Sequence, residues 1–233
     1  GEALEAFRAV QVTVPEADDI RSLLPDRPLQ AHKGTFGTAL IVAGSQNYTG
    51  AVLLAGEAAY RIGTGLVTLA VTEMIQPMLA GHIPEATWLV LPEAGGGVSP
   101  AAARVILDNL ERVSGLLLGP GFGLASPTAE FMVRFLAGGQ YPLQPPAFPP
   151  MVVDADGLKL LARQENWAAA LPANTVLTPH PGEMSVLTGL TRDEIQANRL
   201  EIARRYSREW GHVVVLKGAF TVVAAPDGRT AII

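Results

Sequence analysis

The sequence contains no cysteine, and charged and aromatic residues are scarce. Without cysteine the chain has no disulfide bonds and no thiolate metal sites, which fits a reducing compartment, so we expect a cytoplasmic protein. No apolar run approaches the roughly 20 residues of a membrane span, and no basic region followed by an apolar stretch marks a secretory signal. A membrane partner is therefore not expected.

The charge balance limits the ligands further. A chain with a net charge of -5 has no general attraction for nucleic acid or acidic membranes, so any phosphate group must be held by local residues. With 48% hydrophobic and 17% charged residues, the 233 residues suit one large α/β domain better than two small ones. We expect no nucleic acid partner.

Short apolar runs that end in glycine turns dominate the rest of the chain. One run of β-branched residues leads directly to Lys217 and a glycine turn. Three other apolar runs end in turns at residues 119–123, 154–157 and 178–183. Buried strands with turns of this kind at their carboxyl ends predict an open α/β sheet with its ligand crevice at those ends. The predicted strands are residues 38–43, 66–71, 87–91, 115–118, 151–153, 175–177 and 212–216. The predicted helices are residues 51–62, 74–80, 100–110, 127–136, 158–163 and 192–210.

The two ends of the chain differ from this alternating pattern. Residues 1–30 have no sustained period and predict a lead-in or interdomain linker with one short helix. Residues 219–225 and 229–233 flank Pro-Asp-Gly and predict a hairpin. Because a sheet face without a covering helix is unusual for an α/β domain, we expect the domain formed by residues 31–233 to continue in a longer natural protein. The Pro-rich stretch 141–150 is interpreted as a rigid surface connection, with binding of a partner as the alternative.

The ordered series of motifs resembles the NAD(P)H-hydrate dehydratases of the ribokinase-like superfamily. The resemblance covers about residues 31–233 and rests on the whole series, which is more specific than any single glycine pattern. It implies a three-layer sandwich with a central, mostly parallel sheet flanked by helices. The matching segments are residues 32–37 (His-Lys-Gly-Thr-Phe-Gly), residues 43–51, the three turns above, and residues 216–221 (Leu-Lys-Gly-Ala-Phe-Thr).

Members of that family repair NADH or NADPH whose nicotinamide ring has added water. The resemblance implies that ADP or ATP, with Mg²⁺, phosphorylates the ring hydroxyl so that it can leave as phosphate. The hydrated dinucleotides NADHX and NADPHX are the implied substrates, and the choice between them, like that between ADP and ATP, stays open. An epimerase domain often precedes the dehydratase domain in this family, and we also expect a homo-oligomer.

The resemblance also assigns site residues. The nucleotide would bind at a segment whose backbone amides and lysine can meet phosphates, namely Lys217, Gly218, Ala219, Phe220 and Thr221. The substrate would contact positions with small side chains and one histidine, namely Gly50, Ala51, Gly121, Gly123 and His180. Without the family, the lysine could equally be an edge residue beside a tight turn, and Gly50 could simply open a helix.

His180 and Glu183 form the most informative polar pair. They stand where the wider superfamily has an Asn-x-x-Glu motif, so His180 would contact the dinucleotide and Glu183 would act on the metal through water. Alternatively, His180 caps the next helix and Glu183 is a first-turn acid favoured by the helix dipole. Asp154 is a candidate for the metal shell, whereas Asp156 is predicted to cap the helix that starts at Leu158.

One motif of the superfamily is missing from the sequence. Ribokinase-like enzymes carry a Gly-x-Gly-Asp segment whose amides stabilise the transferring phosphate and whose Asp deprotonates the acceptor hydroxyl. The nearest match, Gly63-Thr64-Gly65, is followed by Leu66, so no catalytic residue is assigned within this chain. Two alternatives therefore remain, a kinase for a vitamin-like alcohol on the same fold and a catalytically silent nucleotide-binding module.

Overall fold

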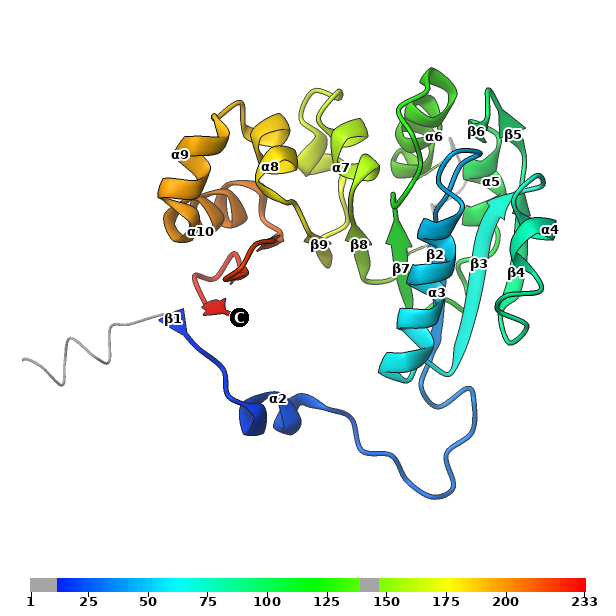
Figure 1. Cartoon of the computed structure of the whole chain (residues 1–233), viewed down its shortest axis with the longest axis horizontal. Helices are drawn as coiled ribbons and strands as arrows, with labels where there is room; N and C mark the ends of the chain where they lie inside the picture. Colours follow the sequence, from blue (N-terminus) through cyan, green and yellow to red (C-terminus); the bar gives the residue numbers. More distant parts are fainter. Residues whose placement is uncertain (1–11, 139–146) are drawn as a thin grey trace, which may run out of the picture. The chain divides into compact units, whose positions relative to one another are not determined.

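The computed structural model describes residues 12–138 and 147–233. The chain divides into two compact units, one formed by Gly1–Gln30 with Val176–Ile233 and the other by Ala31–Thr175. Helices flank the strands of each unit (Figure 1). The main sheet of the second unit is parallel and the first unit mixes parallel with antiparallel pairs, so the predicted fold class, a mostly parallel sheet flanked by helices, is confirmed. Residues 141–146 of the predicted Pro-rich connection lie outside the described residues. In the described ranges, every helix is too short or too polar to span a membrane.

The second unit contains five parallel strands. Their order is β8 (Met151–Val153), β7 (Gly115–Leu118), β2 (Thr38–Val42), β3 (Leu66–Thr72) and β4 (Thr87–Leu91). Each lies within one residue of its predicted bounds, because parallel strands that are covered on both faces are continuous apolar runs. The prediction for this sheet is therefore confirmed.

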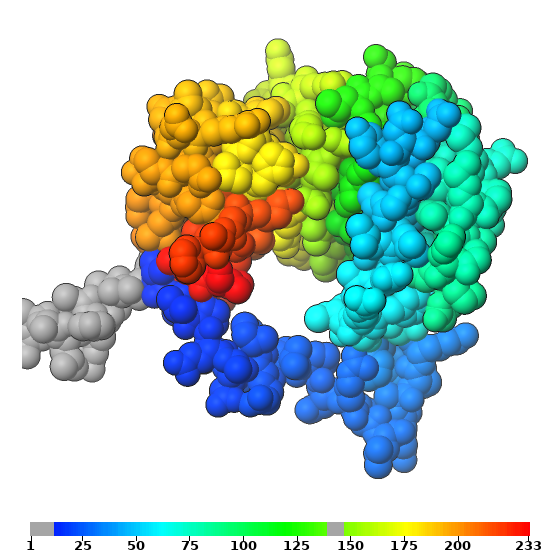
Figure 2. Space-filling model, viewed as in Figure 1, coloured from blue at the N-terminus to red at the C-terminus, as the bar shows by residue number. Residues whose placement is uncertain are grey.

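The helices of this unit were also predicted, although with less accurate ends. They are α3 (Gly50–Ile62), α4 (Gln76–Leu79), α5 (Ala102–Leu107), α6 (Ser126–Leu136) and α7 (Asp156–Leu161), followed by a 3₁₀ turn at Trp167–Ala170. Helix α3 covers one face of β2 and β3 (Figures 1 and 2), where Val52 packs with Ile41 and Leu69 in the core. The small side chains of Ala55 and Ala59 also pack against this core, as expected for close helix–sheet approach.

A short hairpin in the second unit was not predicted. Strands β5 (Glu93–Ala94) and β6 (Gly97–Val98) pair antiparallel around Gly95 and Gly96, both of which have positive φ. The hairpin is joined to the loop after β2 by a hydrogen bond from the Gln46 amide to the Gly96 carbonyl, 3.1 Å long. It therefore contributes to the surface next to that loop.

The first unit contains the C-terminal strands and the predicted hairpin. Strand β10 (Val213–Leu216) pairs parallel with β9 (Thr175–Leu177) and antiparallel with β11 (Val222–Ala224). Strand β12 (Thr230–Ile232) completes the hairpin and pairs in parallel with β1 (Val12–Thr13). The hairpin is confirmed, and the pairing of β1 was not foreseen. The role of residues 1–30 as a linker stays a prediction.

The helices of the first unit correct one prediction. They are α2 (Ala17–Leu23), α8 (Pro181–Thr188), α9 (Arg192–Ala197) and α10 (Arg199–Trp210). The single helix predicted over residues 192–210 is wrong, because Asn198 leaves helical geometry at φ -133° and ψ 37° and separates α9 from α10. Helices α8, α9 and α10 bury Met184, Ile195 and Tyr206 in one core with β10 and β11.

Candidate functional site

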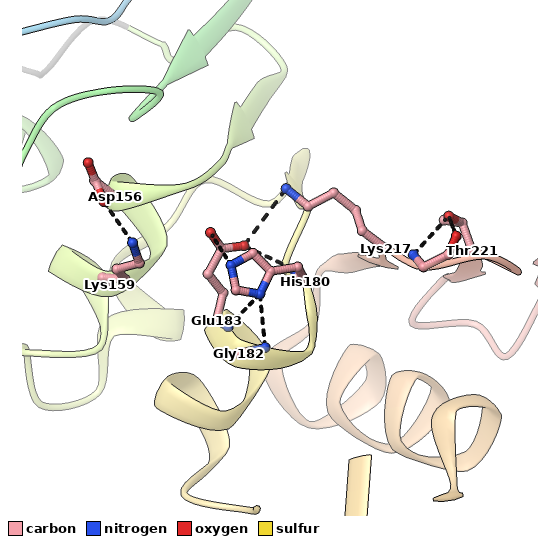
Figure 3. A network of polar contacts seen from close by, with 8 residues as sticks. Asp156, Lys159, His180, Gly182, Glu183, Lys217 and Thr221 are labelled. Atoms are coloured by element: carbon pink, nitrogen blue, oxygen red, sulfur yellow. Dashed lines mark hydrogen bonds and ion pairs between the residues drawn. The ribbon is translucent and has the colours of Figure 1, made fainter. Parts of the chain in front are cut away.

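Residues 217–221 follow directly after β10 and are here called the Lys217 turn. Lys217 is the first residue of this turn. The turn is closed by Thr221, whose hydroxyl accepts from the Gly218 amide at 3.3 Å and donates to the Gly218 carbonyl at 3.1 Å (Figure 3). Among the described residues, the N–H groups of Ala219 and Phe220 donate no hydrogen bond. Two such N–H groups beside a lysine can receive an anion.

The Lys217 side chain extends toward a buried carboxylate. Its Nζ lies 3.8 Å from Oε2 of Glu183, whose side chain is only 4% exposed, while the lysine side chain is 39% exposed. A buried carboxylate is costly unless it is paired and hydrogen-bonded. Lys217 therefore serves Glu183 as a countercharge while part of its side chain remains accessible to a ligand (Figure 3).

His180 and Glu183 cap helix α8 reciprocally. The Nδ1 atom of His180 accepts from the amides of Gly182 at 2.9 Å and Glu183 at 3.2 Å, and Oε2 of Glu183 accepts from the His180 amide at 2.9 Å. This is the geometry of a capping box, in which two side chains satisfy otherwise unpaired amides. The structural alternatives for both residues are confirmed, and their ligand roles stay predictions.

The same contacts determine how the proton is placed on His180. Because Nδ1 accepts hydrogen bonds, it carries no proton, and the neutral imidazole then has its proton on Nε2. Nε2 lies 3.2 Å from Oε1 of Glu183, and half of the His180 side chain is exposed. The imidazole is therefore oriented by Glu183 and can still touch a ligand with its exposed part.

The residues predicted for the metal do not form a metal cage. Within the described residues, no three side chains of His, Asp or Glu come close enough together to hold an ion. Both oxygens of Glu183 face His180 or Lys217. Asp154 lies at the end of β8 in the other unit and is half-buried. The metal roles of Glu183 and Asp154 stay predictions.

In the second unit, the structure brings Gly121 and Ala51 together. Residues 119–123, here called the Gly121 loop, follow β7, and Gly121 has a φ of +69°. A Cβ at Gly121 would lie 2.9 Å from the Cβ atoms of both Ala51 and Tyr48, so only glycine fits. Gly50 has open space around it and begins helix α3. Its alternative as a helix-opening glycine is therefore confirmed.

Asp156 has a different role from the one predicted. It does not cap a helix, because α7 begins at Asp156 itself and the preceding residue, Ala155, has a φ of 52°. Instead, its Oδ2 accepts from the Gly123 amide at 3.0 Å. Its Oδ1 accepts from Nζ of Lys159 at 2.9 Å (Figure 3). Asp156 thus holds the end of the Gly121 loop.

A cavity of about 420 Å³ lies beside the Gly121 loop. Sequence reasoning found Gly123 but missed Lys159 and the glycines of the β5–β6 hairpin, which also line it. Two features of the sequence could have indicated these residues. They are the i,i+3 spacing of Asp156 and Lys159, which is typical of an ion pair on a helix, and the Gly-Gly-Gly run. The lining residues are Ser45, Asn47, Tyr48, Gly95, Gly96, Gly97, Phe122, Gly123, Leu124, Ala125, Asp156 and Lys159.

Parallel strands with glycine turns at their carboxyl ends are the arrangement of an open α/β fold. A ribokinase-like superfamily protein from Enterococcus faecalis superposes with a TM-score of 0.77 at 21% identity, over 95% of this chain and 71% of that one, which shows the fold. A family model described as NAD(P)H-hydrate dehydratase matches residues 39–233. The chain belongs to the NAD(P)H-hydrate dehydratase family.

Individual relatives agree with that assignment. The ADP-dependent (S)-NAD(P)H-hydrate dehydratase of Bacillus subtilis is 33% identical over 213 residues, which are 91% of this chain and 68% of the relative. A crystal structure of the B. subtilis ADP/ATP-dependent enzyme, co-crystallized with ATP/Mg²⁺, has a TM-score of 0.76 and 31% identity, over 96% of this chain and 73% of that one.

A longer relative matches with higher identity. The bifunctional NAD(P)H-hydrate repair enzyme Nnr of Moorella thermoacetica is 43% identical over 210 residues, which are 90% of this chain. This chain spans only 38% of the length of that relative.

We predict that Asp156→Ala loosens the Gly121 loop. The Gly123 amide loses its buried acceptor and Lys159 loses its ion pair, so stability should fall by about 1 to 3 kcal/mol. Urea denaturation measures the loss, and amide hydrogen exchange at Gly123 should become faster. Asp26→Ala, at an exposed position, is the control and should change neither measurement. Unchanged exchange at Gly123 in the Asp156 variant would contradict the contact.

Proposed function

We propose that this chain acts in the nucleotide-dependent dehydration of hydrated NADH or NADPH. The observation that carries the proposal is the Lys217 turn, which combines a lysine with two N–H groups that donate to no described residue. The family membership supports the same reaction class. The relative from B. subtilis is named for this activity, which comes to this chain as a proposal.

The Lys217 turn is the proposed site for the phosphates of ADP or ATP. A chain of net charge -5 can attract phosphates only locally, and the turn offers an ammonium group together with the Ala219 and Phe220 amides. When Mg²⁺ is bound with the nucleotide, it neutralises phosphate charge and usually keeps several waters. Because no metal cage exists among the described residues, the metal would be held mainly by the phosphates, with Glu183 acting only through water or as a countercharge.

The hydrated dinucleotide is proposed to bind at the Gly121 loop. Gly121 and Ala51 present almost no side chain, which lets a flat ring approach the backbone. The cavity beside the loop is large enough for part of a dinucleotide and is lined by glycines and by the Asp156–Lys159 pair. For His180, the proposed role as a substrate contact rests on the family resemblance and on its half-exposed imidazole.

In the proposed reaction, the terminal phosphoryl group of the nucleotide moves to the oxygen of the ring hydroxyl. The carbon–oxygen bond then breaks, phosphate leaves, and loss of a ring proton restores the double bond of the reduced nicotinamide. The described residues support ligand holding in this scheme. No residue of the chain is assigned as the base that removes the hydroxyl proton, since Gly-x-Gly-Asp does not occur among the 233 residues.

We predict that Lys217→Ala weakens the binding of ADP. Loss of a charge-assisted contact typically corresponds to about 1 to 3 kcal/mol, or roughly tenfold to a hundredfold in Kd. Calorimetric titration with ADP measures the change. Lys33→Ala removes the same charge from an exposed position in the other unit and should leave Kd unchanged. Equal affinities of the Lys217 variant and the wild type would refute the nucleotide assignment.

A second prediction concerns the dinucleotide. Ala51→Val places a branched side chain against Gly121, so affinity for hydrated NADH should fall at least about tenfold while affinity for ADP is retained. Ala58→Val makes the same change at an exposed position of the same helix and is the matched control. If both ligands were lost together in a folded Ala51 variant, the two subsites would not be separable. Unchanged dinucleotide binding would remove Ala51 from the site.

The reaction itself is tested by the return of nicotinamide absorbance from hydrated NADH with ADP or ATP and magnesium. General-base assistance is typically worth about 100-fold to 10,000-fold. These 233 residues should therefore bind both ligands but turn over far more slowly than a family member that carries Gly-x-Gly-Asp. A comparable rate would show that another residue of this chain supplies the base. A lasting phosphorylated alcohol would favour the kinase alternative, and nucleotide binding without dinucleotide binding would favour the silent module.

A further inference from the structure

The Lys217 turn rests on a guanidinium group that the reaction scheme above does not use. Arg199 is the first residue of helix α10, and its Nη2 donates to the carbonyls of Leu216 at 2.8 Å and Phe220 at 3.1 Å. Its Nη1 donates to Oε1 of Gln196 at 3.0 Å. One side chain thus binds the backbone on both sides of the turn and is itself held in place.

Each peptide group that bounds the turn is fixed at both ends. The peptide between Leu216 and Lys217 gives its carbonyl to Arg199 and its N–H to the Pro179 carbonyl, at 2.9 Å. The peptide between Phe220 and Thr221 gives its carbonyl to Arg199 and its N–H to the Ile233 carbonyl, also at 2.9 Å. The N–H groups of Ala219 and Phe220, between these two anchors, are the ones that remain for a ligand.

Arg199 also explains why residue 218 is glycine. A Cβ at Gly218 would lie 2.6 Å from Nη2 and 2.8 Å from Cζ of Arg199, so any side chain would displace the guanidinium. The planar guanidinium occupies the space beside the Gly218 α-carbon. Glycine at position 218 therefore leaves room for the guanidinium in the place where it binds both carbonyls.

The position of Arg199 is unfavourable for the helix that carries it. A cation at the first residue of a helix opposes the positive end of the helix dipole, which destabilises the helix. Residues that break a local rule are expected where function requires them. The contacts to Leu216 and Phe220 offset this cost, and the charge also raises the local potential for an anion at the turn.

We propose that Arg199 is a positioning residue for the nucleotide phosphates: it holds the Lys217 turn in its anion-binding geometry and supplies a second positive charge beneath it. This inference rests on the proposed function, because the phosphates are those of the proposed ADP or ATP. Lysine cannot reproduce the role fully, since one guanidinium nitrogen binds both carbonyls while another binds Gln196, and an ammonium group has only one nitrogen.

The test compares Arg199→Ala, Arg199→Lys and Arg208→Ala in the whole chain. Arg208 is exposed on the same helix and its side chain forms no hydrogen bond or ion pair with any described residue, so its variant controls for loss of charge. Two quantities are measured for each variant, namely amide hydrogen exchange of residues 217–221 without ligand and the Kd for ADP. Arg199→Ala should exchange faster in this segment and bind ADP about tenfold to a hundredfold more weakly. Arg199→Lys should recover part of the affinity.

The outcomes separate this inference from the proposed function. Unchanged exchange at residues 217–221 in Arg199→Ala would overturn the inference whatever the chain binds. Faster exchange with an unchanged Kd for ADP would overturn it as well, because the turn would then not be the phosphate site. An equal loss of affinity in Arg208→Ala would reduce the effect to net charge and also overturn it. Wild-type protein without measurable ADP affinity would refute the proposed function, while faster exchange would still support the contact between Arg199 and the turn.

Discussion

Hydrogen bonds from side chains to backbone groups hold the Gly121 loop and the Lys217 turn, the two proposed ligand-binding segments. A loop at a strand end has amides and carbonyls that no sheet partner satisfies, and leaving such groups buried and unpaired is costly. Asp156 accepts from the Gly123 amide, Thr221 closes the turn at Gly218, and Arg199 binds two carbonyls beneath it. The positions at which a ligand can meet the backbone depend on these contacts.

The charges around the Lys217 turn are arranged so that a buried acid does not exclude an anion. Glu183 is almost fully buried, but it accepts a hydrogen bond from the His180 amide, faces Lys217, and lies in the first turn of α8, where the helix dipole favours a negative charge. Its charge is therefore compensated within the protein. Lys217 and Arg199 then present positive charge at the turn in a chain that is acidic as a whole.

The sheet was predicted more accurately than the helices, and the reason is local. A buried parallel strand is a run of apolar residues bounded by a turn, so Gly115–Leu118 and Met151–Val153 were predicted at their observed bounds. Helix ends depend on capping contacts that the period of apolar residues does not reveal. Asp156 was predicted to cap α7 from its spacing alone, whereas its carboxylate binds the Gly121 loop.

The sequence by itself determined the strands, the glycine turns at their ends and the family, because these are properties of consecutive residues. Tertiary structure alone decided which side chains support the turns. Gly123 and Asp156 are 33 residues apart, and Arg199 is 17 residues from Leu216 and 21 from Phe220. Such pairs meet only after the strands have paired and the helices have packed against them, and no local pattern in the chain records which partner each will find.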